Sequence, residues 1–153
     1  MNNEVEKEIY FEIKQIFENA RNKAYRTVNF VMVEAYWEIG KVIVEKQGGQ
    51  KTSKYGSNLL KILSEKLTKD YDKGFDKSNL RNMRQFYLLF QKRDTLCREL
   101  SWSHYRLLMR VENEKARNFY IEECIKENWS VRQLGRQINT FSYERLLASR
   151  GDY

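Results

Sequence analysis

Apolar residues recur along the chain at intervals of three and four, which is the spacing of one face of an α-helix. The strict alternation of a half-buried strand is not found over any comparable length. The chain has no proline, and its few glycines, such as the Gly48-Gly49 pair and Gly74, mark breaks between the periodic segments. The pattern predicts an all-α fold of about six or seven helices, with helix-turn-helix or winged-helix-like units and no convincing sheet.

The first long segment, residues 5–46, carries two apolar stripes on nearly opposite faces, either as one helix or as two helices that adjust near residues 19–22. The stripe expected to face the core consists of Val28, Val31, Met32, Ala35, Ile39 and Val42. The opposite stripe consists of Phe30, Val33, Trp37 and Val44. Because an exposed apolar patch is unusual on a monomer, the opposite stripe predicts an interface. Either the helix over residues 5–17 covers it or a second copy does, and we expect a homodimer.

The middle of the chain has the order helix, turn, helix. Residues 57–69 are amphipathic, a turn is expected around Gly74, and the next helix is expected over residues 76–91 with Asp76 or Ser78 as its cap. The apolar side of that helix consists of Leu80, Met83, Phe86, Tyr87 and Phe90. Two helices joined by a glycine-containing turn form the skeleton of a helix-turn-helix.

Four more helices are expected in the last third of the chain, over residues 100–111, 114–128, 131–138 and 143–149. Ser130 and Gln133 have the spacing of a capping box, with Trp129 in the position of a hydrophobic staple. The helix that they open places apolar residues on one side and Arg132 and Arg136 on the other.

At 153 residues the chain is long enough to bury one core, and no flexible linker divides it, so we expect a single domain over residues 1–153. Its 32% charged and 14% aromatic residues argue against a disordered and against a membrane-embedded chain. The polar, acidic N-terminus is unlike a signal peptide, and a cytoplasmic location is expected. Cys97 and Cys124 lack metal-ligand spacing and are expected to be reduced packing residues.

Positive charge is concentrated in the middle of the chain, whose formal net charge is +7. Residues 51–110 carry 14 Lys and Arg against 6 Asp and Glu, whereas residues 1–50 carry 7 against 8 and residues 111–153 carry 7 against 7. A basic segment of this kind suits a polyanion, because neutralised phosphates release their counterions. A solvated face that keeps the protein soluble would have the same composition.

The predicted helix after the turn carries the candidate DNA contacts. Planar Arg and Gln side chains are suited to phosphate forks and to base edges in a major groove. The DNA-binding set is Lys73, Lys77, Ser78, Arg81, Arg84, Gln85 and Lys92. The alternative is a cationic helix face that is merely solvated.

A second basic ridge is formed by Arg132 and Arg136, which could contact phosphates. They could instead pair with acids of the preceding helix, such as Glu123 and Glu127, and we favour this internal pairing.

The sequence offers little catalytic chemistry. His104 is the only histidine, and between Trp102 and Tyr105 it is expected to be a packed, hydrogen-bonded residue rather than a catalytic one. Glycine-rich phosphate loops are absent, so no nucleotide cofactor is expected, and no metal site is expected either.

From about Ala20 to Ser149 the chain resembles the N-terminal domain of the bacterial YhcG family, known as domain of unknown function 1016. The runs that carry the resemblance are Val28-Asn29, Tyr36-Trp37-Glu38-Ile39-Gly40, Tyr55-Gly56, Gly74-Phe75, Asn79-Leu80-Arg81-Asn82-Met83-Arg84-Gln85-Phe86-Tyr87, Leu100-Ser101-Trp102-Ser103-His104-Tyr105, Arg117-Asn118-Phe119-Tyr120, Trp129-Ser130-Val131-Arg132-Gln133-Leu134 and Tyr143-Glu144-Arg145. The resemblance implies a helical region that precedes a C-terminal PD-(D/E)xK-type nuclease domain. That nuclease domain is expected to be absent from this chain, so no nuclease residue carries over.

Two hypotheses follow. The first is a non-catalytic module that docks the helix over residues 76–91 into duplex DNA. It thereby targets a nuclease domain, in cis or in trans, to that DNA. The second is a protein-interaction or dimerisation module, in which the stripe of Trp37 joins chains and the basic middle only solubilises. An enzyme complete in itself is disfavoured, because the required constellations of residues are missing.

Overall fold

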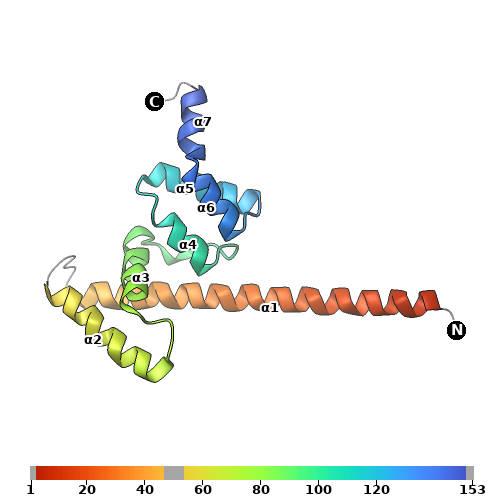
Figure 1. Cartoon of the computed structure of the whole chain (residues 1–153), viewed down its shortest axis with the longest axis horizontal. Coiled ribbons are helices and arrows are strands. Elements are labelled where there is room, and N and C mark those ends of the chain that lie inside the picture. The colour runs from red at the N-terminus through yellow and green to blue at the C-terminus, as the bar shows by residue number, and fades with distance from the viewer. Residues whose placement is uncertain (1–2, 47–53, 151–153) are drawn as a thin grey trace.

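The computed structural model describes residues 3–46 and 54–150, and the side chains of residues 54–57 are outside that description, as is the predicted break at Gly48-Gly49. The described residues form helices and no strand, which confirms the all-α prediction. In chain order the helices are α1 (Asn3–Lys46), α2 (Lys54–Tyr71), α3 (Lys77–Leu89), α4 (Trp102–Leu108), α5 (Glu114–Lys126), α6 (Val131–Asn139) and α7 (Ser142–Arg150), with a 3-10 turn at Arg93–Thr95 (Figure 1). Without a strand in the described ranges, no β-hairpin there could serve as the wing of a winged helix.

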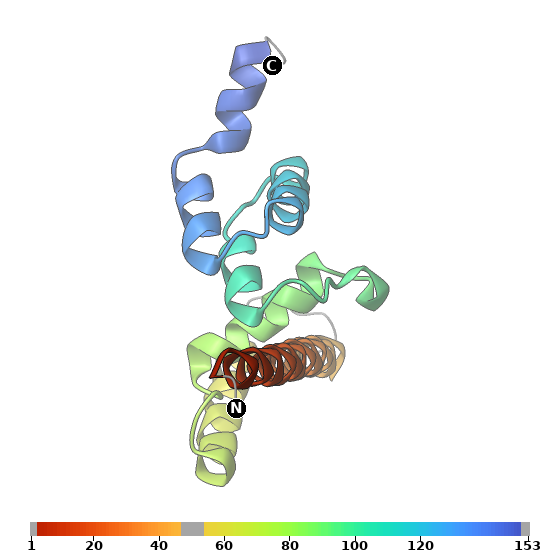
Figure 2. The same ribbon diagram turned by 90° about the vertical axis from the view of Figure 1, so that its right-hand side faces the viewer.

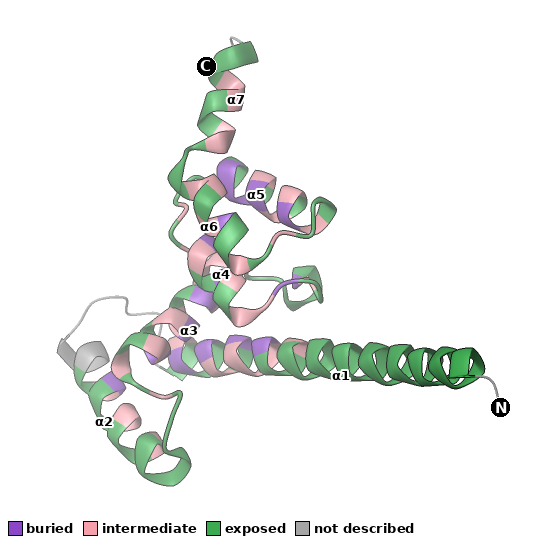
Figure 3. Cartoon of the chain, turned by 45° about the vertical axis from the view of Figure 1, so that its right-hand side comes forward, coloured by how far each residue is buried: buried purple, intermediate pink, exposed green. Residues whose placement is uncertain are grey.

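α1 is one continuous helix of 44 residues, without a break at residues 19–22. At 1.5 Å per residue it is about 66 Å long. Residues 3–29 are exposed throughout, and this half of α1 projects away from the rest of the chain, whereas residues 30–46 cross its body (Figures 1 and 3). Of α1, only the second half therefore contributes to the core of the protein.

The structure reverses the predicted roles of the two apolar stripes on α1. Val33 and Trp37 are buried, Phe30 packs at the edge of the same core, and Val44 is half-buried. The stripe that was predicted to face the core is 42–58% exposed at Val28, Val31, Met32 and Val42, whereas its other two members, Ala35 and Ile39, are half-buried. The prediction was wrong because the two stripes are similarly apolar, and nothing local shows which one the rest of the chain covers. The interface assigned to Phe30, Val33, Trp37 and Val44 is thus largely occupied by the chain's own core.

α3 crosses α1 at Gly40. A Cβ atom added to Gly40 would lie 2.0 Å from the carbonyl oxygen of Met83, so only glycine allows the two backbones to approach this closely. Beside the crossing, the buried residues Ile43, Leu60 and Leu80 join Met83 in one cluster. α2, α3 and the second half of α1 therefore form a three-helix unit.

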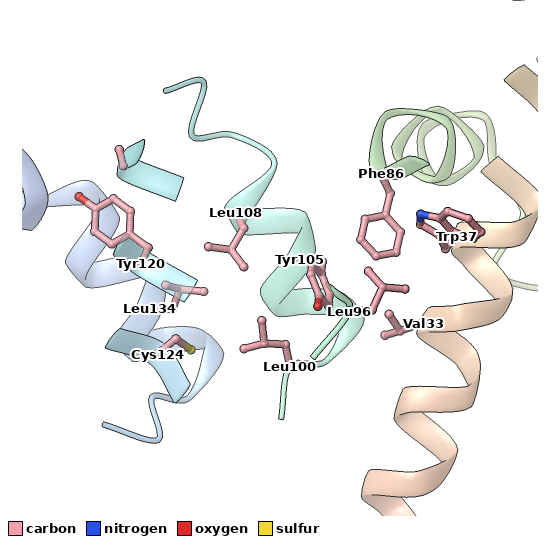
Figure 4. Packing of buried hydrophobic residues seen from close by; sticks show 11 residues of the cluster. Val33, Trp37, Phe86, Leu96, Leu100, Tyr105, Leu108, Tyr120, Cys124 and Leu134 are labelled. Carbon is pink, nitrogen blue, oxygen red and sulfur yellow. The ribbon is translucent and has the colours of Figure 1, made fainter. Parts of the chain in front are cut away.

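A larger core runs from this crossing into the helices that follow (Figure 4). Phe86 of α3 lies next to Trp37 of α1, and its ring centroid is 4.8 Å from that of Tyr105 in α4. The Trp37 indole Nε1 donates a hydrogen bond of 2.6 Å to the Phe90 carbonyl oxygen. Beyond Tyr105 the core continues through Leu108, Tyr120, Cys124 and Leu134. In the view along α1, α2 and the helices α4–α7 lie on opposite sides of α1 (Figure 2).

Side-chain caps begin several helices where the sequence predicted them. Asp76 Oδ1 accepts from the backbone N–H of Asn79 at 2.7 Å, so Asp76, not Ser78, caps α3. Ser130 Oγ accepts from the Gln133 N–H at 3.1 Å, and Gln133 Oε1 accepts from the Ser130 N–H at 2.8 Å. The predicted capping box of α6 is therefore confirmed.

His104 uses both ring nitrogens in the structure. Its Nδ1 accepts from the backbone N–H of Ser101 at 3.1 Å, which leaves the proton on Nε2 to donate to the Trp129 carbonyl oxygen at 2.9 Å. The ring thus caps α4 and ties it to the segment before α6. This confirms His104 as a packed, hydrogen-bonded residue.

Cys97 and Cys124 are free thiols, the first half-buried and the second buried, as predicted for packing residues. Burial raises the pKa of the Cys124 thiol to about 11 and also raises the pKa of Cys97. Both side chains are therefore neutral around pH 7.

Candidate nucleic-acid interface

Asn79 holds the start of α3 in place. Its side-chain Nδ2 donates to the Gly74 carbonyl oxygen at 2.6 Å, and its Oδ1 accepts from the Trp102 indole Nε1 at 3.1 Å. The turn before α3 is thereby fixed to α3 and to α4. Sequence analysis missed this role, because Trp102 lies 23 residues further along the chain and no local pattern links the two.

α3 divides its side chains as its periodicity predicts. The residues that face the neighbouring helices are buried, namely Leu80, Met83 and Phe86. Ser78, Arg81 and Gln85 are exposed on the opposite side, at intervals of three and four. We call these three residues the α3 outer face. It combines a hydroxyl, a guanidinium and a carboxamide on one exposed helix surface.

The cations around the α3 outer face differ in exposure. Lys73 in the turn and Lys92 after the helix are exposed, whereas Lys77 and Arg84 are half-buried at the edges of α3. Among the described residues, the ion pairs are Lys41–Glu45, Arg93–Glu34 and Arg93–Glu38. None of the predicted DNA-binding cations belongs to one of these pairs, so their charge is available to an external anion.

Arg106 adds a cation that the sequence analysis did not select. It is exposed on α4, and it lines a small cleft together with Gly74, Asp76, Ser78, Asn79 and Trp102. The cleft lies between the turn, the first turn of α3 and α4. Only the packing of α4 against α3 places Arg106 there, so no sequence pattern near α3 could have identified it.

Other cations of the basic middle segment have internal partners. Arg93 contacts Glu38 at 2.7 Å and Glu34 at 3.3 Å, and the Arg98 guanidinium lies 4.8 Å from the centroid of the Phe30 ring. Part of the positive charge between residues 51 and 110 therefore stabilises the fold, and composition alone overstates the charge that is free for a ligand.

Arg132 and Arg136 lie exposed on α6, at a spacing that puts them on one side of the helix. Neither forms an ion pair with Glu123 or Glu127 in the structure, so the favoured internal pairing is wrong. The two guanidinium groups remain a separate basic ridge.

A further basic cleft lies between α1 and the segment that precedes α4. It is lined by Lys23, Arg26, Thr27, Phe30, Arg98, Glu99 and Asn128. Sequence analysis did not select Lys23 and Arg26, because the first 50 residues carry slightly more acids than bases. Their proximity to Arg98 becomes evident only in the folded chain.

In the parts of the chain that the structure describes, no three His, Cys, Asp or Glu side chains are grouped so that they could hold a metal ion. Within the same ranges, no helix has both the length and the apolar character needed to span a membrane.

These features define an all-α module whose third helix presents an exposed polar and cationic surface. The chain belongs to the family described as the DUF1016 N-terminal domain, whose model matches residues 12–145. A protein of Escherichia coli (strain K12) named "Putative nuclease YhcG" is 38% identical over 175 aligned positions, which cover 93% of this chain and 47% of that protein. The chain thus spans about half the length of this relative. The resemblance inferred from the sequence is confirmed, and no solved structure matches the chain significantly.

Proposed function

We propose that this module binds duplex DNA through the α3 outer face and thereby directs a nuclease domain, in cis or in trans, to its substrate. The observation that carries the proposal is the separation of α3 into a buried apolar side and an exposed side with Ser78, Arg81 and Gln85. A helix of this kind, held after a tight turn, is what a major groove admits. Such a module would act in the cytoplasm, where bacterial DNA lies.

The side chains suit distinct contacts. Arg81 can donate two hydrogen bonds to the O6 and N7 of guanine, and Gln85 can bond the N6 and N7 of adenine. Lys73 in the turn before α3, Lys77 and Arg84 on α3, and Lys92 after it would contact phosphates, which set the register on the duplex without reading its sequence. Arg106 is placed to add one more phosphate contact beside the first turn of α3.

Binding of a fluorescein-labelled duplex, followed by anisotropy across a salt series, tests the proposal. For the unmodified chain the affinity should fall steeply as salt rises. Arg81→Ala with Arg84→Ala should weaken binding at least tenfold at low salt and make the salt dependence shallower by about 1 log unit per log unit of salt, since Arg84 is the phosphate contact of the two and each such contact contributes roughly 0.9.

Arg132→Ala with Arg136→Ala is the matched control, because it removes the same charge from a different helix. It should change the affinity by less than threefold. Circular dichroism should show that both double variants keep their helical content. Equal losses in the two variants would mean that only the total charge matters, and an unchanged affinity in the α3 variant would place the site elsewhere.

We further propose that the module contributes no catalytic group to DNA cleavage, and that cleavage depends on the remainder of a longer protein. The name of the Escherichia coli relative describes a nuclease, and this chain matches less than half of that protein's length. Incubating supercoiled plasmid with the purified chain and Mg²⁺ or Mn²⁺ should give no nicked product. Metal-dependent nicking that disappears when a single acidic residue of this chain is replaced would contradict the proposal.

A further inference from the structure

One face of α1 is apolar along nearly its whole length and is not covered by the rest of the chain. Its exposed members are Val5, Ile9, Ile13, Ile16, Phe17, Ala20, Ala24, Val28, Val31, Met32 and Val42, and we call them the α1 outer stripe. They lie roughly opposite Val33, Trp37 and Gly40, through which α1 packs on the body of the chain. This stripe differs from the one to which the sequence analysis assigned an interface.

The stripe has a regular period. Ile9, Ala20, Val31 and Val42 follow one another at intervals of eleven residues. Eleven residues make three turns at about 3.67 residues per turn, close to the 3.6 of an α-helix, so the stripe runs almost straight along α1. A straight apolar stripe is the surface that a second long helix can follow over its full length.

The size of the stripe also indicates a large partner. Its large side chains are 42–70% exposed. Together they offer on the order of 800 Å² of apolar surface, which is about the area that each partner buries in a standard interface. In addition, residues 3–29 project as a helix that is exposed on every side, and most helical stability in proteins comes from tertiary packing.

We propose that a second copy of this chain covers the α1 outer stripe, with the two α1 helices antiparallel and centred on Ala24. In an antiparallel pair centred on Ala24, Ile13 of one copy lies opposite Ala35 of the other, and Phe17 lies opposite Val31. At these two positions a bulky residue of the first half meets a smaller one of the second half, as close packing requires.

Charge supports the antiparallel orientation. Glu38 lies on the same face as the stripe, four residues before Val42, and a parallel pair would place it, with its ion-pair partner Arg93, close to the Glu38 of the partner copy. The antiparallel pair places Glu38 near Tyr10, which is 68% exposed. The antiparallel pair therefore avoids this contact between like charges.

The antiparallel dimer also bears on the proposed DNA contact, although the dimer proposal does not rest on DNA binding. Each body packs on the second half of its own α1, and in an antiparallel pair the two second halves lie at opposite ends. The two bodies therefore lie at opposite ends of the helix pair. One duplex would then contact the α3 outer face of one copy, and the dimer would not be needed for that contact.

Analytical ultracentrifugation of the full chain tests the interface. The unmodified chain should be a dimer, and Ile13→Glu should weaken self-association at least tenfold. Phe11→Glu is the matched control, because Phe11 is an equally exposed apolar residue on the same helix but lies off the stripe. It should leave the dimer intact. A monomeric unmodified chain at high concentration, or equal effects of the two substitutions, would overturn the proposal.

Disulfide cross-linking tests the orientation. A mixture of Ile13→Cys and Ala35→Cys chains should form a cross-link between the two variants under mild oxidation, and neither variant alone should cross-link above the background of the native chain with Cys97 and Cys124. Efficient cross-linking of Ile13→Cys with itself would show a parallel pair and overturn the antiparallel arrangement. Ile13→Glu should also leave the affinity for a short duplex unchanged, which separates a failure of dimerisation from a failure of DNA binding.

Discussion

Gly40 of α1 lies so close to Met83 of α3 that a Cβ atom at position 40 would stand 2.0 Å from the Met83 carbonyl oxygen. The same added atom would lie 2.8 Å from the carbonyl carbon and 3.1 Å from the Cβ of Tyr87. The obstacle is backbone, so it cannot move aside as a flexible side chain would. The position of α3, and with it the α3 outer face, thus depends on one glycine.

Gly40→Ala should therefore destabilise the protein by about 1–3 kcal/mol, because the two helices must separate to make room for the methyl group. Urea denaturation followed by circular dichroism measures this change. Gly135→Ala is the control, since a Cβ there would meet only Leu107 Cδ1 at 3.5 Å, an ordinary contact. That substitution should be neutral or stabilising by about 0.5–1 kcal/mol, because alanine favours the helix. Equal effects of the two substitutions would argue against the close crossing.

Trp37→Phe should cost about 0.5–1.5 kcal/mol of stability, because it removes the donor to the Phe90 carbonyl oxygen and leaves that part-buried acceptor without its partner. Trp37→Glu should prevent folding, since it buries an unpaired charge in the main core. Phe11→Ala, an exposed aromatic position of the same helix, should change stability by less than about 0.5 kcal/mol in the monomeric Ile13→Glu background. Thermal unfolding measures the stability of all three variants. A well-folded Trp37→Glu chain would show that Trp37 lies at the surface and not in the core.

The stability of the protein should fall at alkaline pH because of Cys124. Burial raises the pKa of its thiol from 9.0 to about 11 in the folded chain, so the unfolded chain releases the proton first as pH rises. This contribution is complete below pH 9, decreases by about 1 kcal/mol per pH unit between pH 9 and 11, and levels off above that range. Cys124→Ala should be less stable at pH 7 but lose stability less steeply with pH. If the stability of the unmodified chain and of Cys124→Ala fell in parallel with rising pH, Cys124 would not be the cause of the loss.

The helices could be predicted from the sequence because the information is local. Leu80, Met83 and Phe86 follow the helical period, and Asp76 and the Ser130-Gln133 pair are caps within three residues of their partners. Which face of α1 is covered could not be predicted, because both faces are apolar and the choice depends on contacts with Phe86 and Phe90, about 50 residues away.

The residues of the candidate site also divide into those that the local sequence predicts and those that only the tertiary structure identifies. The exposure of Arg81 and Gln85 followed from the period of their own helix. The roles of Asn79 and Arg106 depend on α4, and the pairing of Arg93 with Glu38 depends on α1, so both required the tertiary structure. Charge counted along the sequence does not distinguish a cation with an internal partner from a cation that is free for a phosphate.

Photo-crosslinking from the α3 outer face tests most directly whether this surface contacts DNA. The photoreactive residue p-benzoylphenylalanine would replace Gln85 in one chain and the exposed Glu122 of α5 in another, and each would be irradiated with a labelled duplex at low salt. We predict a protein–DNA cross-link from position 85 that high salt abolishes, and none above background from position 122. A cross-link from position 122 alone, or no cross-link from position 85 while the duplex stays bound, would contradict the account.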